Sequence, residues 1–100
     1  MKKIAISKNH QVDIEIVFTA LAHVSRRHIL YCLSQKGAPM LGGEIADQLS
    51  CSWPTTTGHL QVLTKAGLIT VHKNGREKIY SLNYVRLAVV QKWILDLKPK

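Results

Sequence analysis

The chain has few of the residues that build disulfide scaffolds and metal sites. Its two cysteines, Cys32 and Cys51, form no CxxC pair and no repeated spacing, which argues against a disulfide framework and against a zinc knuckle. No two of its five histidines have the i, i+4 spacing that would place two metal ligands together on one helix. We therefore expect no metal, no cofactor and a reducing, cytoplasmic setting.

Long apolar runs are also missing. No stretch approaches the roughly 20 apolar residues that a membrane-spanning helix needs. The first residues, MKKIAIS, resemble the charged head of a secretory signal, but the apolar run lasts three residues and ends at Ser7. We expect a soluble protein that is not exported and that has no membrane partner.

Acidic residues are scarce compared with basic ones. There are 6 aspartates and glutamates against 14 lysines and arginines, so the formal net charge is +8 and the sequence pI is about 9.8. Most of the excess lies in residues 48–100, which hold eight basic and two acidic side chains. A positive field of this strength on a small protein attracts polyanions such as nucleic acids.

Catalytic signatures are absent as well. No set of serine or cysteine, histidine and acidic residues converges in the sequence, and no glycine-rich phosphate loop precedes a helix. The chain has 100 residues, 46% of them hydrophobic, and no internal repeat or linker. We expect one globular domain over residues 1–100 that is not an enzyme.

What the sequence does contain is a series of apolar-periodic segments separated by short breaks. The fourth of these segments has the clearest ends, because Ser52 is a good N-cap, Pro54 suits the first turn and Gly67 follows as a C-cap. The helices that the periodicity predicts cover 12–22, Ser25 to about Gln35, 43–50, 53–66 and 84–97.

The first and last of these helices carry more apolar surface than one helix face can bury. This surplus predicts that 12–22 and 84–97 are dimerisation helices, the alternative being ordinary core packing within a monomer. The predicted dimer residues are Ile14, Val17, Phe18, Leu87, Val90, Trp93, Ile94 and Leu97.

Two arginines stand at an unfavourable place. Arg26 and Arg27 begin the second helix, where positive charge opposes the helix dipole. Two explanations are open: a salt bridge to an acidic neighbour such as Glu44 or Asp47, or a bound phosphate.

A hairpin follows the fourth helix. Residues 68–72 and 78–82 alternate apolar and polar side chains around Asn74 and Gly75, and the tip carries Lys73, Arg76 and Lys78. Two helices joined by a short turn and followed by a basic hairpin have the order of a winged helix-turn-helix, whose second helix enters the DNA major groove. We expect a mainly α fold with a small β-hairpin (α+β), ordered α-α-α-α-β-β-α, with the helix-turn-helix over 43–66 and the wing over 68–82.

The fourth helix has two chemically different sides. Periodicity buries Thr56, Leu60, Leu63 and Gly67 and turns outward an arc with hydroxyls, an amide and a lysine but no carboxylate. Such a face suits phosphates and base edges, although a solvated polar helix face is the alternative. Glycine in this arc costs helix stability, so either a partner approaches the backbone closely there or the position has drifted. The arc consists of Pro54, Gly58, Gln61 and Lys65, flanked by Thr55, Thr57 and Val62.

These features lie in a string that resembles a known family. The residues EIADQLSCSWPTTTGHLQVLTKAGLITVHKNGREKIYSLN, with ALAHVSRRHILYCL before them, are similar to the core of the ArsR/SmtB bacterial repressors. The resemblance covers about residues 17–83 and is most specific in the serine-started helix ending HLxxLxxAGLI and in the hairpin ending IYSLN. It implies a homodimer of winged helices, paired through the first and last helices, that represses an operon by occupying a near-palindromic operator.

The size of the chain agrees with this implication. A compact chain of this length has a radius of gyration near 13 Å, whereas consecutive major-groove half-sites lie roughly 34 Å apart, so two subunits are needed to read both. The expected partners are double-stranded DNA and a second copy of the chain. The residues expected to contact DNA are Ser52, Trp53, Thr55, Thr57, Gly58, His59, Gln61, Lys65, Lys73, Asn74, Arg76 and Lys78.

The sequence departs from the family at its sensor sites. Leu41 and Gly43 stand where many members carry a metal-binding CxC pair, and the last helix offers only Asp96 for the second metal site. Cys32 occupies the place of one of two redox cysteines in some members, but the partner is missing, which favours a core thiol. Cys51 precedes the recognition helix, where modification would weaken DNA binding. A redox role for Cys51 or Cys32 is therefore a hypothesis, and the sequence indicates no inducer.

Three alternatives stay open. Trp53 either contacts a sugar and a thymine methyl at the groove edge or covers the turn before its helix. His59 either touches a phosphate or packs beside that turn. The function also has an alternative, because a basic charge equally suits a winged helix that binds a protein or RNA without operator specificity.

Overall fold

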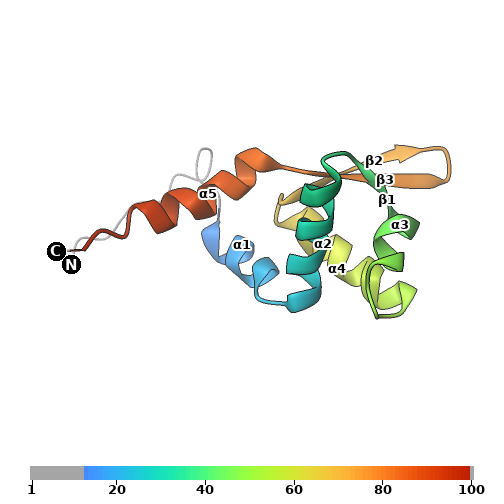
Figure 1. The fold of residues 1–100 in the computed structure, drawn as a ribbon, viewed down its shortest axis with the longest axis horizontal. Coiled ribbons are helices and arrows are strands. Elements are labelled where there is room, and N and C mark those ends of the chain that lie inside the picture. Colours follow the sequence, from blue (N-terminus) through green and yellow to red (C-terminus); the bar gives the residue numbers. More distant parts are fainter. Residues whose placement is uncertain (1–12, 100) are drawn as a thin grey trace.

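The computed structural model describes residues 13–99 and has a helical body with two projections (Figure 1). The hairpin extends from one end of the body and the last helix from the other, and the principal extents are 49 × 28 × 24 Å. The radius of gyration, 15.2 Å, exceeds the value near 13 Å of a compact chain because both projections reach beyond the core. The MKKIAIS segment, His10 and the expected helix start at residue 12 lie outside the described residues.

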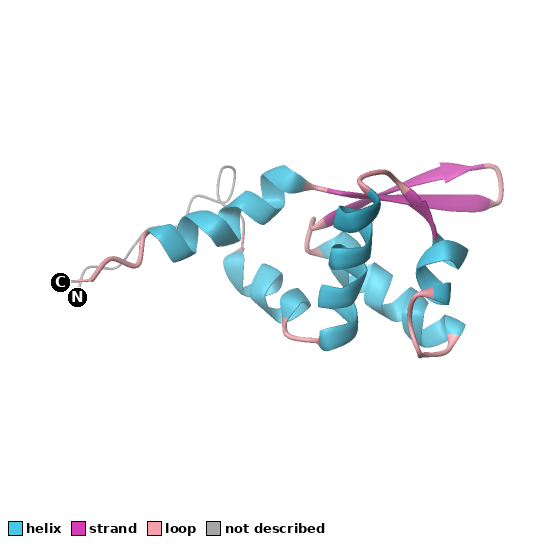
Figure 2. Cartoon of the chain, viewed as in Figure 1, coloured by secondary structure: helices cyan, strands magenta, loops and turns pink. Residues whose placement is uncertain are grey.

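The elements follow the order expected of a winged helix-turn-helix, which confirms the predicted mainly α fold with a small β-hairpin. Figure 2 shows the strands along one edge of the helices. No helix in residues 13–99 is long and apolar enough to span a bilayer. The elements are α1 (Ile14–Leu21), α2 (Val24–Lys36), β1 (Met40–Leu41), α3 (Gly42–Asp47), α4 (Trp53–Lys65), β2 (Ile69–Asn74), β3 (Glu77–Leu82) and α5 (Tyr84–Leu95).

The sheet contains one strand that the sequence did not predict. The three strands are antiparallel in the order β1-β3-β2, and Tyr80 of β3 stands opposite Val71 of β2 and Met40 of β1. β1 has only two residues, too few to show an alternating pattern, and it is a strand only because it pairs with distant β3. Gly75 turns the hairpin with a φ of 65°, a conformation that glycine adopts without steric cost.

The ends of α4 confirm Ser52 as the N-cap, whereas the C-cap is Ala66 and the predicted Gly67 is the next residue. The Ser52 Oγ accepts a hydrogen bond from the Thr55 N–H at 3.3 Å, and Pro54 lies in the first turn. Gly67 follows the last turn in the left-handed region, with a φ of 76°. These local contacts define the start and end of the helix independently of its packing.

The ends of α2 and α3 differ from the expected ones. His23 caps α2, because its Nδ1 accepts a hydrogen bond from the Ser25 N–H at 3.1 Å, so the prediction of Ser25 as the cap was wrong. α3 ends at Asp47 rather than at residue 50. There the N–H groups of Gln48 and Leu49 bond to carbonyls three residues back, which tightens the chain into a 3₁₀ turn.

The core lies where α2, α3 and α4 meet the sheet. Leu60 and Leu63 on α4 are 1% and 0% exposed, as the periodicity predicts. Thr56 on the same side is fully buried, and its hydroxyl donates to the Ser52 carbonyl at 3.0 Å, so its polar group is satisfied. The largest fully buried side chains are Ile29, Leu33, Ile45, Leu60, Leu63, Leu68, Ile69, Val17 and Thr56.

The arginines at the start of α2 form no salt bridge to Glu44 or Asp47 within residues 13–99, so that explanation was wrong, and the bound phosphate stays a prediction. Arg26 donates from Nε to the Ala20 carbonyl at 2.7 Å and from Nη2 to the Thr19 carbonyl at 3.1 Å. Arg27 donates to the Leu21 carbonyl at 2.7 Å. Both side chains therefore bond to carbonyls at the end of α1, where the helix dipole also favours a cation. The two cations stabilise the corner between α1 and α2.

Arg26 also connects this corner to α4. Its Nη1 lies 3.3 Å from the Nδ1 of His59, and the centroid of the His23 ring lies 4.4 Å from that of His59. His59 is only 9% exposed. Burial lowers the pKa of His59 below its ordinary value, and the nearby His23 and Arg26 charges lower it further. The imidazole is thus held neutral, as an acceptor for the guanidinium.

Replacing Arg26 by methionine is expected to destabilise the fold by about 1–3 kcal/mol, because carbonyls at the end of α1 lose charge-assisted hydrogen bonds. Arg27→Met is the matched control. It removes one exposed bond and should cost less than about 1 kcal/mol. Urea unfolding measures both, and equal losses would contradict the role given to Arg26.

His59 should make stability depend on pH. Because its folded pKa lies below the unfolded value of about 6.5, its stabilisation is fully present above that pH and is lost as pH falls through the folded value. Urea unfolding from about pH 7.5 down to about pH 5.5 should show this loss. His59→Gln keeps an acceptor for Arg26 without titrating and should flatten the profile, whereas the exposed control His28→Gln should not. If the free energy of unfolding of H59Q fell with pH as steeply as that of wild type, His59 would not be the cause of the pH dependence.

Candidate nucleic-acid interface

The outward side of α4 is exposed where the sequence predicts it. Thr55, Gln61 and Lys65 are exposed, and no acidic residue occurs in the helix. The Ser52 hydroxyl donates to the Thr55 hydroxyl at 3.0 Å, so these two side chains form one polar group at the start of the helix. The face therefore offers hydroxyls, an amide and an ammonium group to an anionic partner.

Gly58 lies partly exposed on the same side. A Cβ built at this position would have no heavy atom within 4 Å among the described residues. Packing within the chain therefore does not require a glycine, and its φ does not lie in the left-handed region. The two explanations offered from the sequence, close approach of a partner or drift, both stay open.

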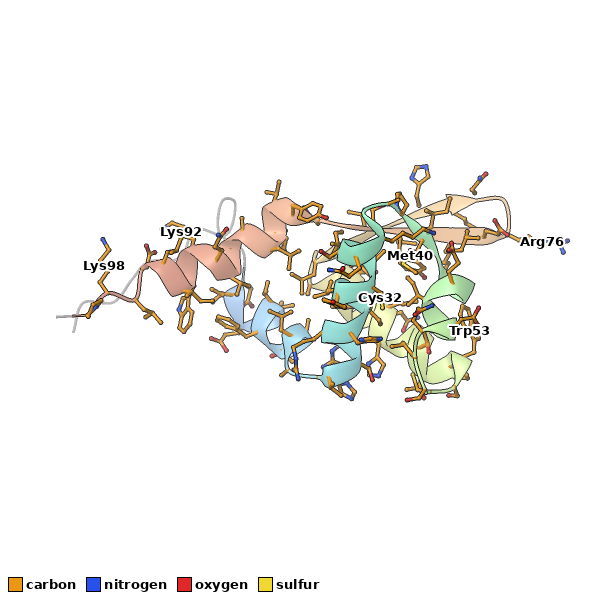
Figure 3. All side chains as sticks on the ribbon, viewed as in Figure 1. Cys32, Met40, Trp53, Arg76, Lys92 and Lys98 are labelled. Atoms are coloured by element: carbon orange, nitrogen blue, oxygen red, sulfur yellow. The ribbon has the colours of Figure 1, made fainter. Side chains whose placement is uncertain are left out.

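The wing carries its cations without compensation. Lys73 and Lys78 are opposite each other in the register of the hairpin, and Arg76 stands at the tip (Figure 3). Like charges at directly opposite positions destabilise a hairpin. Within residues 13–99 the salt bridges join Lys36 to Glu44 and Lys92 to Asp96, so none involves the wing. The wing therefore presents three cations beside one acid, Glu77, and none of the cations is held in a salt bridge within residues 13–99.

Trp53 lies between the outward side of α4 and the wing. Its ring lies against the start of α3, close enough that a Cβ on Gly42 would stand 3.1 Å from the Trp53 Cη2 atom. The residue is still 54% exposed. Trp53 thus lies against α3 and keeps about half of its surface exposed to a partner.

His59 does not lie on the outward face. It is buried against Arg26 and His23, which favours the packing alternative over the phosphate contact. The signal was present in the sequence, because His59 stands four residues before Leu63, a spacing that puts both on one side of a helix. We leave His59 out of the proposed DNA contacts.

The two cysteines are each partly buried. Burial raises the pKa of the Cys32 thiol, which favours the unreactive protonated form, and its Sγ lies 3.6 Å from the Nε2 of His28. The Cys51 Sγ lies 3.3 Å from the Thr56 hydroxyl at the start of α4. A redox role for either residue stays a prediction. Within residues 13–99, no group of three or more histidine, cysteine or acidic side chains is placed to hold a metal ion.

The predicted dimer residues divide into two groups. Val17 is fully buried, so it belongs to the core and not to an open surface, which corrects its assignment. Ile14, Phe18, Leu87 and Val90 are partly buried, and Trp93, Ile94 and Leu97 are exposed. The Phe18 and Trp93 rings meet edge to face, with centroids 5.1 Å apart, and join α1 to α5. No residue of α5 is fully buried, which leaves its apolar side available to a partner.

Comparison with known proteins agrees with this arrangement. A model of a helix-turn-helix domain matches residues 21–72. The transcriptional repressor SdpR of Bacillus subtilis is 38% identical over 84 residues, which are 84% of the chain and 91% of that repressor. The solved structure of an ArsR-like transcriptional regulator from Rhodococcus sp. RHA1 superimposes with a TM-score of 0.71 and 28% identity, over 83% of this chain and 76% of the other.

A second solved structure is described as a homodimer. It is a winged helix-turn-helix DNA-binding domain from Mycobacterium bovis, with a TM-score of 0.67 and 26% identity over 83% of this chain and 78% of the other. The matched family model covers the helix-turn-helix, and the Mycobacterium bovis structure is described as a winged helix-turn-helix. The chain belongs to the ArsR/SmtB family of winged helix-turn-helix transcriptional regulators.

Proposed function

We propose that this protein is a homodimeric repressor that binds an inverted-repeat operator in double-stranded DNA. The observation that carries the proposal is the carboxylate-free outward side of α4 beside a wing whose cations have no acidic partner within residues 13–99. The similarity to a named repressor and to a homodimeric DNA-binding domain supports it. A bacterial regulator of this kind acts in the cytoplasm, where the DNA lies.

The two surfaces have different tasks in this proposal. The outward side of α4 enters the major groove and reads base edges, and the wing holds the phosphate backbone. The proposed contacts are Ser52, Trp53, Thr55, Thr57, Gly58, Gln61 and Lys65 from α4 and its cap, and Lys73, Asn74, Arg76 and Lys78 from the wing.

The dimer forms through the open apolar side of α5 together with α1. Trp93 and Ile94 are 45% and 55% exposed in the single chain, an unfavourable exposure of large apolar groups that a second copy would remove. Pairing through these helices leaves both α4 helices free to enter successive major grooves on one side of the duplex.

DNA affinity is expected to fall steeply with salt, because each phosphate contact releases counterions. The logarithm of affinity should fall with the logarithm of salt at a slope near 0.9 per contacted phosphate. Fluorescence anisotropy of a labelled inverted-repeat duplex, selected by the protein from a random pool, measures this slope. A flat salt profile, or equal affinity for the selected duplex, a random duplex and RNA, would overturn the proposal.

Variants of the two surfaces should differ in what they lose. Arg76→Gln should weaken binding to all duplexes by a similar factor and lower the salt slope by about one contact. Gln61→Ala should instead relax the preference at particular base pairs, with a cost of about 1–3 kcal/mol on the selected duplex. Binding measured across single-base variants of the duplex separates the two patterns, and identical patterns would show that this division of tasks is wrong.

Ile94→Glu is expected to break the dimer, because it places a charge in the apolar contact of α5. Sedimentation equilibrium should show a monomer, and affinity for the two-half-site duplex should fall by at least about tenfold. Val24→Glu makes the same change at an apolar residue of α2 that is 67% exposed and should alter neither measurement. A dimeric I94E protein would place the interface elsewhere.

A further inference from the structure

A cavity of about 460 Å³ opens between the first turn of α4, the start of α3 and the wing. The Trp53 and Tyr80 rings form its apolar wall, and Arg76 and Lys78 stand at the wing side. Figure 3 shows Trp53 on the helical body and Arg76 at the end of the hairpin. The cavity thus combines aromatic surface with two cations.

The glycine at the start of α3 makes this arrangement possible. A Cβ on Gly42 would stand 3.1 Å from the Trp53 Cη2 and 3.4 Å from the Tyr80 Cε2. A larger residue would therefore push the Trp53 ring toward the space that the cavity occupies. Gly42 instead lets the ring lie against the start of α3, and Trp53 stays 54% exposed.

The charges around the cavity favour an anion. Tyr80, Lys78 and Lys73 share one face of the hairpin, because side chains alternate along a strand and Lys73 stands opposite Lys78. The adjacent Glu77 also lines the cavity, although strand alternation directs its side chain toward the opposite face of the hairpin. The other acid at the cavity is Glu44. Its pKa is lowered by the hydrogen bond to Lys36, at 2.6 Å, and by that to the Leu41 N–H, so its negative charge is already compensated.

The position of the cavity relates to the two grooves of DNA. In the proposed function α4 lies in the major groove and the wing reaches beyond it. One sugar-phosphate strand always separates a major groove from the adjacent minor groove. That strand must pass between α4 and the wing, which is where Trp53, Thr57, Arg76 and Lys78 line the cavity.

We propose that this cavity is a seat for one strand of the operator, with a backbone phosphate against Arg76 and Lys78 and its deoxyribose on the Trp53 ring. The inference rests on the proposed function and adds to it a defined nucleotide subsite in each subunit. The cations supply charge-assisted hydrogen bonds to the phosphate, and the tryptophan ring supplies apolar contact to the sugar carbons. The subsite sets the position of the protein on the duplex and does not read its sequence.

The first test follows the emission of Trp53 while anisotropy of the labelled duplex reports binding. The selected inverted-repeat duplex should change tryptophan emission in wild type, in step with the anisotropy, and Trp53→Phe should abolish most of that change. Binding without any change in emission would overturn the subsite while leaving the proposed function intact. Absence of binding to every duplex would overturn the proposed function itself.

The second test neutralises one phosphate at a time with a methylphosphonate linkage. At one position in each half-site, between the major groove and its neighbouring minor groove, this linkage should lower the affinity of wild type by about tenfold. A loss of this size is expected for a single charge-assisted contact. Arg76→Gln or Lys78→Gln should bind less tightly overall and be insensitive to that linkage. Lys98→Gln, which removes the same charge far from the cavity (Figure 3), should keep the wild-type profile. If Arg76→Gln and Lys78→Gln are as sensitive as wild type to the linkage at every position, the subsite does not exist.

Discussion

The structure depends on the burial of one side of α4. Leu60 and Leu63 are almost completely enclosed, and Thr56 sits among them with its hydroxyl bonded to the Ser52 carbonyl. Because these residues recur at helical spacing, burying them determines the rotation of the helix and hence which residues face outward. The surface proposed to contact DNA is therefore the side of α4 opposite the core. A change in the packed side would turn or shift Thr55 and Gln61 although it alters no residue of the outward side.

The excess of positive charge is used in two ways. Arg26, Arg27 and Arg86 donate to backbone carbonyls, the last to Ala66 at the end of α4 at 3.0 Å, so these cations belong to the framework. The lysines and the arginine of the wing have no acidic partner within residues 13–99. Net charge alone indicated a polyanionic partner, but only the distinction between these two groups locates the surface that can receive one.

Much of the fold and part of the site could be predicted from local patterns. The caps of α4, its buried side and the turn of the wing follow from residues within a few positions of one another. β1 and the role of Arg26 could not be predicted in this way. β1 is a strand only by pairing with β3, and Arg26 reaches α1 carbonyls that no short-range pattern connects to it. His59, next to predicted contacts in the sequence, proved to face inward, as its position four residues before Leu63 already indicates.

The sequence by itself determined the order of the elements, the amphipathic sides of the helices and the strongly basic second half, because periodicity, caps and charge act over a turn or two of chain. Only the tertiary structure decided where Trp53 lies, what His59 contacts, and which cations, among the described residues, bond to backbone carbonyls rather than stay unpaired on the wing. Arg26 and His59, for example, are 33 residues apart in the chain, and whether their side chains meet depends on how α2 packs on α4. Contacts of this range are set by the packing of whole elements, for which no local sequence pattern exists.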